Sequence, residues 1–302
     1  MATIVGIHGI GQQYGDAYQL GSAWFDALRG GLAAAGMHGV AQGLDTGDLQ
    51  VAFFGDLFRP AGAMASATNE PPYGPDDVRP GLERDLLTTF YQAVLEQDAD
   101  LAPTEDTMGA GMVATAFMLR LLLKSPTFAG LAEHALIGNL RQVSDYLTNQ
   151  AVRTAVLGRL GPCIGDDTLV VIGHSLGSVV AYEYLCQYQP ASVRLLLTLG
   201  SPLGIPNLIF DRLTPAPADG HGAWPGTLPA WVNVADPDDI VALRPDLAGL
   251  FTGPPPGRVD DRKVANPPKA PHGVTTYLNA RETGSALGHA LAQGPAEARP
   301  RL

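Results

Sequence analysis

The chain has 302 residues, enough for one sizeable hydrophobic core, and its 46% apolar and 16% charged residues exclude an intrinsically disordered protein. Its formal net charge is −11, and its few Lys and Arg residues are scattered along the sequence. This charge distribution argues against nucleic acid and against an anionic membrane surface as binding partners.

The amino-terminal residues are not typical of a targeting signal. Residues 1–11 contain no basic region, no long apolar core and no small-residue cleavage site. The other notable apolar stretch, 112–123, is too short to span a membrane and is interrupted by Arg120. We therefore expect no membrane span and a cytoplasmic location.

The apolar pattern predicts strands and helices that alternate along the chain. Short runs of branched apolar residues bounded by Gly are typical of buried parallel strands, whereas apolar residues spaced three and four apart indicate helices. In chain order we predict a strand at 3–7, a helix at 17–35, a strand at 49–54, helices at 82–95, 111–123 and 128–160 (the last broken), a strand at 168–172, a helix at 178–187, strands at 193–199 and 231–235, and short helices at 274–278 and 285–293. Segments rich in Pro and Gly, at 60–80, 202–230 and 249–271, are predicted to be loops.

This alternation predicts an α/β fold with a doubly wound, mostly parallel sheet. Between 81 and 160 the sequence has no strand pattern, and that much helix is more than one crossover between parallel strands requires. We interpret residues 60–160 as a helical cap inserted into a single domain, 1–302.

Residues 173–177, GHSLG, match the G-x-S-x-G pattern of a nucleophile elbow. A bare match is weak, because Gly is abundant in this chain and a glycine-rich turn with an ordinary serine is the alternative. The context is specific, since an apolar strand enters the motif and a helix leaves it. Gly173 and Gly177 would let the helix approach the strand, with Ser175 at the helix N-terminus. We predict Ser175 as the nucleophile and the Leu176 N–H as an oxyanion donor.

A second glycine-rich segment, His8-Gly9-Ile10-Gly11, follows the first predicted strand. A G-x-G at this place also occurs in dinucleotide-binding folds, but that fingerprint requires a glycine where this chain has Tyr14. Serine hydrolases with a nucleophile elbow hold their second oxyanion donor in a loop after an early strand. We predict the Ile10 N–H as this donor, with Gly11 as the alternate, and expect His8 to order the loop.

Three histidines follow Ser175, and one of them is the candidate general base. In the chain order of this class, the nucleophile comes first, then the acid, and the histidine last. His221 precedes the last predicted strand, and His289 lies in a predicted terminal helix. His272 lies in a Pro-His-Gly loop before a short helix, and we predict it as the base. His174, next to the nucleophile, is expected to point away from it and to support the site by packing.

The acid is expected soon after the last predicted strand, where the chain reads Asp236-Pro237-Asp238-Asp239. A carboxylate here would hydrogen-bond the far ring nitrogen of His272 and stabilise its imidazolium form. All three aspartates also suit an exposed loop, so sequence position alone leaves the choice among them open.

Taken together, these motifs resemble the lipase/esterase branch of the α/β-hydrolases. The matching pieces are the early HGIG, the GHSLG elbow, the LGSPLG segment at 199–204, the late Asp-Ile-Val and the Pro-His-Gly near the end, within residues 1–58 and 165–280. In such enzymes the acid is often the Asp directly before a branched apolar pair. The resemblance therefore implies Asp239 as the acid, with Asp236 as the alternate.

The expected function is hydrolysis of a carboxylic ester, thioester or lipid acyl bond through a Ser-His-Asp triad and an acyl-enzyme intermediate. Two alternatives remain: an acyltransferase or cyclase that uses the same triad with an alcohol or amine acceptor, and a binding protein with an inactive site. We expect a small-molecule acyl substrate and neither a cofactor nor a metal. The sequence has no HExxH motif, and Cys163 and Cys186 have no metal-type spacing. The oligomeric state stays open.

Overall fold

The structure, a computed structural model, describes residues 2–59, 71–98, 112–253 and 257–292. Its centre is a six-stranded sheet in which every neighbouring pair is parallel, in the order β2-β1-β3-β4-β5-β6. The strands are β1 (Ile4–Ile7), β2 (Leu49–Ala52), β3 (Val170–His174), β4 (Leu195–Leu199), β5 (Ala230–Ala235) and β6 (Asp260–Lys263). This sheet, flanked by helices on both faces, confirms the predicted fold class.

Alternating side chains of the central strands point into two separate hydrophobic cores. Val170 and Ile172 belong to a core shared with Leu28 of helix α1 (Ala17–Ala34), whereas Val171 belongs to a core shared with Val179 of helix α7 (Leu176–Tyr188). All of these side chains are buried. Both faces of the sheet are therefore covered, which explains why the strands read as nearly continuous apolar runs.

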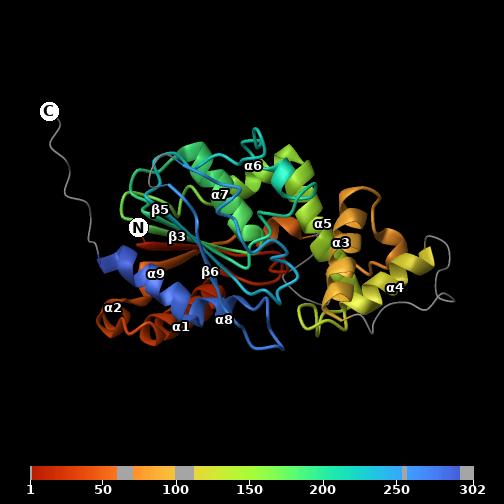
Figure 1. Ribbon diagram of the computed structural model, residues 1–302, viewed down its shortest axis with the longest axis horizontal. Coiled ribbons are helices and arrows are strands. Elements are labelled where there is room, and N and C mark those ends of the chain that lie inside the picture. The colour runs from red at the N-terminus through yellow and green to blue at the C-terminus, as the bar shows by residue number, and fades with distance from the viewer. Residues whose placement is uncertain (1, 60–70, 99–111, 254–256, 293–302) are drawn as a thin grey trace.

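The helices form one layer on each face of the sheet and a third group beyond one end of it (Figure 1). They are α1 (Ala17–Ala34), α2 (His38–Gly43), α3 (Leu82–Gln97), α4 (Met112–Leu122), α5 (Glu133–Thr148), α6 (Gln150–Gly158), α7 (Leu176–Tyr188), α8 (Val274–Asn279) and α9 (Arg281–Ala292). On one face α1 packs against α8 and α9, and on the other α7 packs against β3, β1 and β4 and contacts α6. Within the described part of the chain, no helix has the length and apolarity that a membrane span requires.

The strand order reverses direction between β1 and β3. The chain passes outward from β1 to β2, then crosses back to β3 and continues through β4 and β5 to the opposite edge. In open α/β sheets, ligands bind at the carboxyl ends of the strands at such a reversal. The loops that follow β1 and β3 carry the two glycine-rich motifs, so the topology places both motifs at this point.

The third group of helices comes from the long segment between β2 and β3. Helix α3 packs against α4 and α5, and the three lie beyond the end of the sheet toward which the strands run (Figure 1). Leu86 and Phe90 of α3, Leu119 of α4 and Leu140 of α5 continue the core that β1 and α7 share. Part of the predicted cap, at 60–70 and 99–111, lies outside the described residues.

One prediction of secondary structure was wrong, and one short helix was missed. Residues 249–271 were expected to form a loop, but Asp260–Lys263 forms β6 at the edge of the sheet. Four charged residues carry no apolar alternation, and charge is common on exposed edge strands because it discourages further pairing. The Asp261 carboxylate also accepts hydrogen bonds from the Leu247 and Ala248 N–H groups at 3.0 and 2.8 Å, which fixes this strand to the preceding loop. The short helix α2 was not predicted.

Candidate active site

Ser175 lies on a sharp turn between β3 and α7. Its backbone has φ 54° and ψ −130°, a conformation that non-glycine residues rarely adopt and that costs free energy. The turn is held on both sides, because the Ser175 N–H donates to the Leu199 carbonyl at 3.1 Å and the Ser178 N–H donates to the Ser175 carbonyl at 2.9 Å. Strand β3 extends through His174, two residues beyond the predicted strand, so the serine follows the strand directly.

The two glycines of the motif lie where the turn has no room for a side chain. A Cβ atom added at Gly177 would lie 2.1 Å from the Ile7 carbonyl oxygen, and one at Gly173 would lie 2.5 Å from the Ser178 Cα atom. Helix α7 therefore begins in direct backbone contact with β1 as well as with β3. This close approach is the physical reason for glycine on both sides of the serine.

Replacing Gly177 with alanine is expected to destabilise the fold by about 1–3 kcal/mol, because backbone atoms of β1 must move to admit the methyl group. The matched control is Gly21→Ala in the second turn of α1, where an added Cβ atom meets nothing within 4 Å. That variant is expected to gain about 0.5–1 kcal/mol from the better helix propensity of alanine. Urea unfolding of both variants measures the difference, and equal midpoints would contradict this description of the turn.

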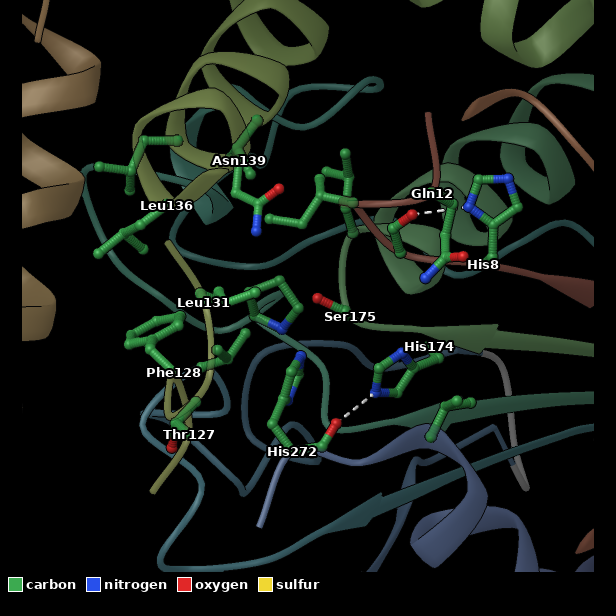
Figure 2. A pocket seen from close by; sticks show the side chains of 18 of the residues that line it. His8, Gln12, Thr127, Phe128, Leu131, Leu136, Asn139, His174, Ser175 and His272 are labelled. Atoms are coloured by element: carbon green, nitrogen blue, oxygen red, sulfur yellow. Dashed lines mark hydrogen bonds between the residues drawn. The ribbon is translucent and has the colours of Figure 1, made fainter. Parts of the chain in front are cut away.

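Ser175 and His272 face one cavity of about 270 Å³ at the carboxyl end of the sheet. Figure 2 shows both side chains at this cavity, with Phe128, Leu131 and Leu136 on the side opposite Ser175. Ser175 itself is buried. Among the described residues that line the cavity, none is Asp, Glu, Lys or Arg, and most are apolar.

The loop before α8 brings His272 to the carboxylate of Asp239. The His272 Nδ1 atom lies 2.7 Å from Asp239 Oδ2, and the aspartate side chain is fully buried whereas the histidine side chain is 17% exposed. Asp239 Oδ1 accepts the Val241 N–H at 2.9 Å, and Oδ2 also accepts the Tyr277 hydroxyl at 2.8 Å. With Nδ1 directed at the carboxylate, His272 has Nε2 left to face a reacting group.

The carboxylate of the alternate acid, Asp236, is bound by backbone N–H groups rather than by the histidine ring. Its two carboxylate oxygens accept the backbone N–H groups of Asp238 at 2.9 Å and of Asn266 at 2.6 Å. Asp238 is exposed. Of the three candidate aspartates, the structure therefore brings only Asp239 into contact with His272.

The two competing histidines lie outside the cavity. His221 is exposed and its Nδ1 atom lies 2.9 Å from the Asp219 carbonyl. His289 is also exposed and lies 2.6 Å from the Ser285 carbonyl within α9. Neither lines the cavity that contains Ser175.

The loop after β1 packs its backbone against the serine. A Cβ atom added at Gly9 would lie 2.8 Å from the Ser175 Cβ atom, and Ile10 lines the same cavity. The Gly11 N–H donates to Gln142 Oε1 of α5 at 3.2 Å, and the Gln142 amide in turn donates to Gln13 Oε1 at 3.1 Å. The N–H group of Gly11, the alternate oxyanion donor, is therefore already bound to the Gln142 side chain of α5.

His8 is a buried, neutral histidine that shapes this loop. Burial lowers the pKa of His8 to about 4. Its Nε2 atom accepts the Phe54 N–H at 3.1 Å, and its Nδ1–H donates to the Gly9 carbonyl at 2.6 Å. The ring also stacks on Phe54 with centroids 4.0 Å apart. These contacts join the ends of β1 and β2 beside the cavity.

His174 supports the loop that carries His272. Its Nε2 atom lies 3.0 Å from the His272 carbonyl oxygen, and the two rings have centroids 4.6 Å apart (Figure 2). Burial, and after it the neighbouring His272, holds the pKa of His174 well below its usual range. The neutral ring therefore donates a hydrogen bond to the backbone of the His272 loop.

Two contributors to this site, Tyr277 and Gln142, were missed in the sequence. Tyr277 lies on α8, five positions after His272, but a buried aromatic residue in a short helix has no feature that separates it from a core residue. Gln142 lies on α5, 131 positions from its partner Gly11, so no local pattern could connect them. Among the described residues, no cluster of His, Cys, Asp and Glu could hold a metal ion.

Comparison with known proteins relates the segment around Ser175 to a described family. A family model described as "PGAP1-like alpha/beta domain" matches residues 145–216, a segment that contains Ser175 and ends before Asp239 and His272. No curated protein and no solved structure matches the chain significantly. The sheet is that of an α/β-hydrolase-like fold, and the segment around the elbow is similar to a lipase/esterase-like family of the α/β-hydrolase type.

Proposed function

We propose that the protein is a serine hydrolase that cleaves a carboxylic ester, thioester or lipid acyl bond, with Ser175, His272 and Asp239 as its catalytic triad. The observation that carries this proposal is the 2.7 Å contact between His272 Nδ1 and the buried Asp239 carboxylate, beside a strained serine that faces the same cavity. The similarity of residues 145–216 to a lipase/esterase-like family supports it at the level of the superfamily.

In this mechanism the Nε2 atom of His272 takes the Ser175 proton as the hydroxyl oxygen attacks the acyl carbonyl. Asp239 keeps the ring in the required tautomer and stabilises the imidazolium. The N–H groups of Leu176, at the start of α7, and Ile10 bind the oxyanion. His272 then protonates the leaving group, and water activated by the same histidine releases the acid.

We further propose that α3, α4 and α5 form a cap that contributes the acyl pocket. Three apolar cap residues that line the cavity are Phe90, Leu136 and Leu140, all buried. Since the described lining has no Asp, Glu, Lys or Arg, the substrate group held there is uncharged and apolar. A cavity of about 150 Å³ holds benzene, so this larger one has room for about ten carbon atoms.

The rate of hydrolysis is therefore expected to depend on acyl chain length. Across a series of p-nitrophenyl esters, kcat/KM should rise about fourfold per methylene up to about eight to ten carbons and then fall. Leu131→Ala, at a lining residue that is 38% exposed, should move the maximum to longer chains. Leu57→Ala is the matched control, because Leu57 is 36% exposed and lies outside this cavity. A flat profile would contradict the acyl pocket.

A fluorophosphonate probe tests the chemistry itself. The folded protein should form one adduct, and peptide mass analysis should locate it on Ser175. Assays with and without an alcohol acceptor then separate hydrolysis from acyl transfer. Absence of any adduct on the folded protein would instead favour the inactive binding protein.

A further inference from the structure

The Tyr277 hydroxyl lies between Asp236 and Asp239, in the loop that follows β5. It donates to Asp239 Oδ2 at 2.8 Å and accepts the Asp236 N–H at 3.0 Å. The tyrosine is fully buried and belongs to α8, which begins two residues after His272. One short segment of chain therefore supplies both groups that donate to the same carboxylate oxygen.

The Asp239 carboxylate is held by three donors, one from the loop after β5 and two from the segment that contains His272 and Tyr277. Oδ2 accepts the Nδ1–H of His272 and the hydroxyl of Tyr277, while Oδ1 accepts the N–H of Val241. Three fixed donors compensate a buried carboxylate for its lost hydration. Because His272 and Tyr277 share one oxygen, the tyrosine withdraws negative charge from the atom that faces the imidazole.

Gly200, at the end of β4, closes the space around this shared oxygen. A Cβ atom added at Gly200 would lie 2.8 Å from both Asp239 Oδ2 and a ring carbon of Tyr277, and 3.1 Å from His272 Nδ1. Its φ of +51° also favours glycine. The three side chains are therefore packed against the Gly200 backbone, which leaves no room for a side chain at position 200.

We propose that Tyr277 is a positioning residue that fixes the Asp239 carboxylate for His272 and tunes how strongly that carboxylate stabilises the imidazolium. This role rests on the triad proposed above. Burial, and after it the charge of Asp239, raises the pKa of Tyr277, so the hydroxyl keeps its proton and remains a donor over the working pH range. It touches neither substrate nor the reacting oxygen in this role.

Three other titratable groups lie near the Asp239–His272 pair. His174 approaches His272 from β3 and is neutral, and the buried His8 near it is neutral as well. Asp236 is bound by backbone N–H groups at both carboxylate oxygens. A change in the pH profile on removal of the Tyr277 hydroxyl would therefore report on the Asp239–His272 pair.

The test is Tyr277→Phe, compared with Tyr146→Phe. Tyr146 is an equally buried tyrosine whose hydroxyl donates to the buried Glu183 carboxylate at 2.6 Å, between α5 and α7. In Tyr277→Phe we expect kcat for an activated ester to fall about tenfold, the loss of one hydrogen bond to a charged group, with KM nearly unchanged. The acid limb of the kcat/KM profile should move to higher pH. Asp239 Oδ2 then accepts a hydrogen bond from His272 alone and stabilises its imidazolium form more strongly. Tyr146→Phe should leave the limb in place.

Fluorophosphonate labelling distinguishes failure of this inference from failure of the proposed function. If Ser175 is labelled in the parent protein, and Tyr277→Phe keeps the parent kcat and pH profile, Tyr277 has only a packing role. An identical shift of the limb in both variants would also overturn the inference, since it would be a general effect of losing a buried hydroxyl. If the parent protein takes no label and hydrolyses no ester, the proposed function itself fails.

Discussion

Replacing Ser175 with alanine is expected to lower kcat/KM for an activated ester by at least about 10⁴-fold, because the acyl-enzyme can no longer form. The fluorophosphonate adduct should disappear in the same variant. Alanine occupies the strained turn with the same backbone conformation, so the melting temperature should stay close to that of the parent protein. Steady-state hydrolysis and intact-protein mass measure the two effects.

The matched control is Ser192→Ala. The Ser192 hydroxyl donates to the Gly165 carbonyl at 2.8 Å, away from the cavity. This variant should keep both its label and its activity. Retention of full activity in Ser175→Ala would contradict the proposed nucleophile, and a label on another serine would redirect the assignment to that residue.

Replacing Asp239 with asparagine is expected to lower kcat by about 10³–10⁴-fold, as when a triad carboxylate loses its charge and its histidine takes the wrong tautomer. Ser175 should still be present in the same turn, so slow labelling by the probe should remain measurable. The large effect is expected because Asp239 Oδ2 accepts a hydrogen bond from His272 Nδ1 at 2.7 Å. An asparagine amide nitrogen in that place would be a donor instead of an acceptor.

Asp236→Asn is the matched control for Asp239→Asn. It removes a negative charge from the same loop but leaves the carboxylate that contacts His272 in place. Both aspartates are buried, and Asp236 binds two backbone N–H groups with its side chain. Loss of one such acceptor should cost about 1–3 kcal/mol of unfolding free energy and less than about tenfold in kcat. Equal losses of kcat in the two variants would show that the loop, and not a specific carboxylate, supports the histidine.

The parts of the site that lie close together in the chain were predictable. The elbow needs only a strand, a helix and two glycines within five residues, and the turn at Ser175 has that form. The sequence order of strands also placed the loops of Ile10 and His272 at the same end of the sheet. In contrast, the choice of Asp239 came from resemblance, since its contact with His272 joins positions 33 residues apart.

What escaped prediction depends on contacts across the fold. The edge strand Asp260–Lys263 is set by pairing with β5, and its charged sequence has no apolar signal. The occupation of the Gly11 N–H depends on Gln142, which approaches only when α5 packs beside the loop after β1. The role of Tyr277 also depends on such contacts, because its hydroxyl is distinguished from that of an ordinary core tyrosine only by its hydrogen bonds to Asp236 and Asp239.

The hydrogen bond between Gly11 and Gln142 joins the helical segment to the loop that carries Ile10. The donor–acceptor distance of 3.2 Å is at the upper end of the usual range, so a displacement of α5 by about half an ångström away from the loop would break this bond. Such a displacement would release the loop whose backbone packs against Ser175, the proposed nucleophile. In the proposed mechanism, a bulky substrate that displaced α5 would therefore weaken the loop that carries the Ile10 donor, so the position of one helix would link substrate size to stabilisation of the oxyanion.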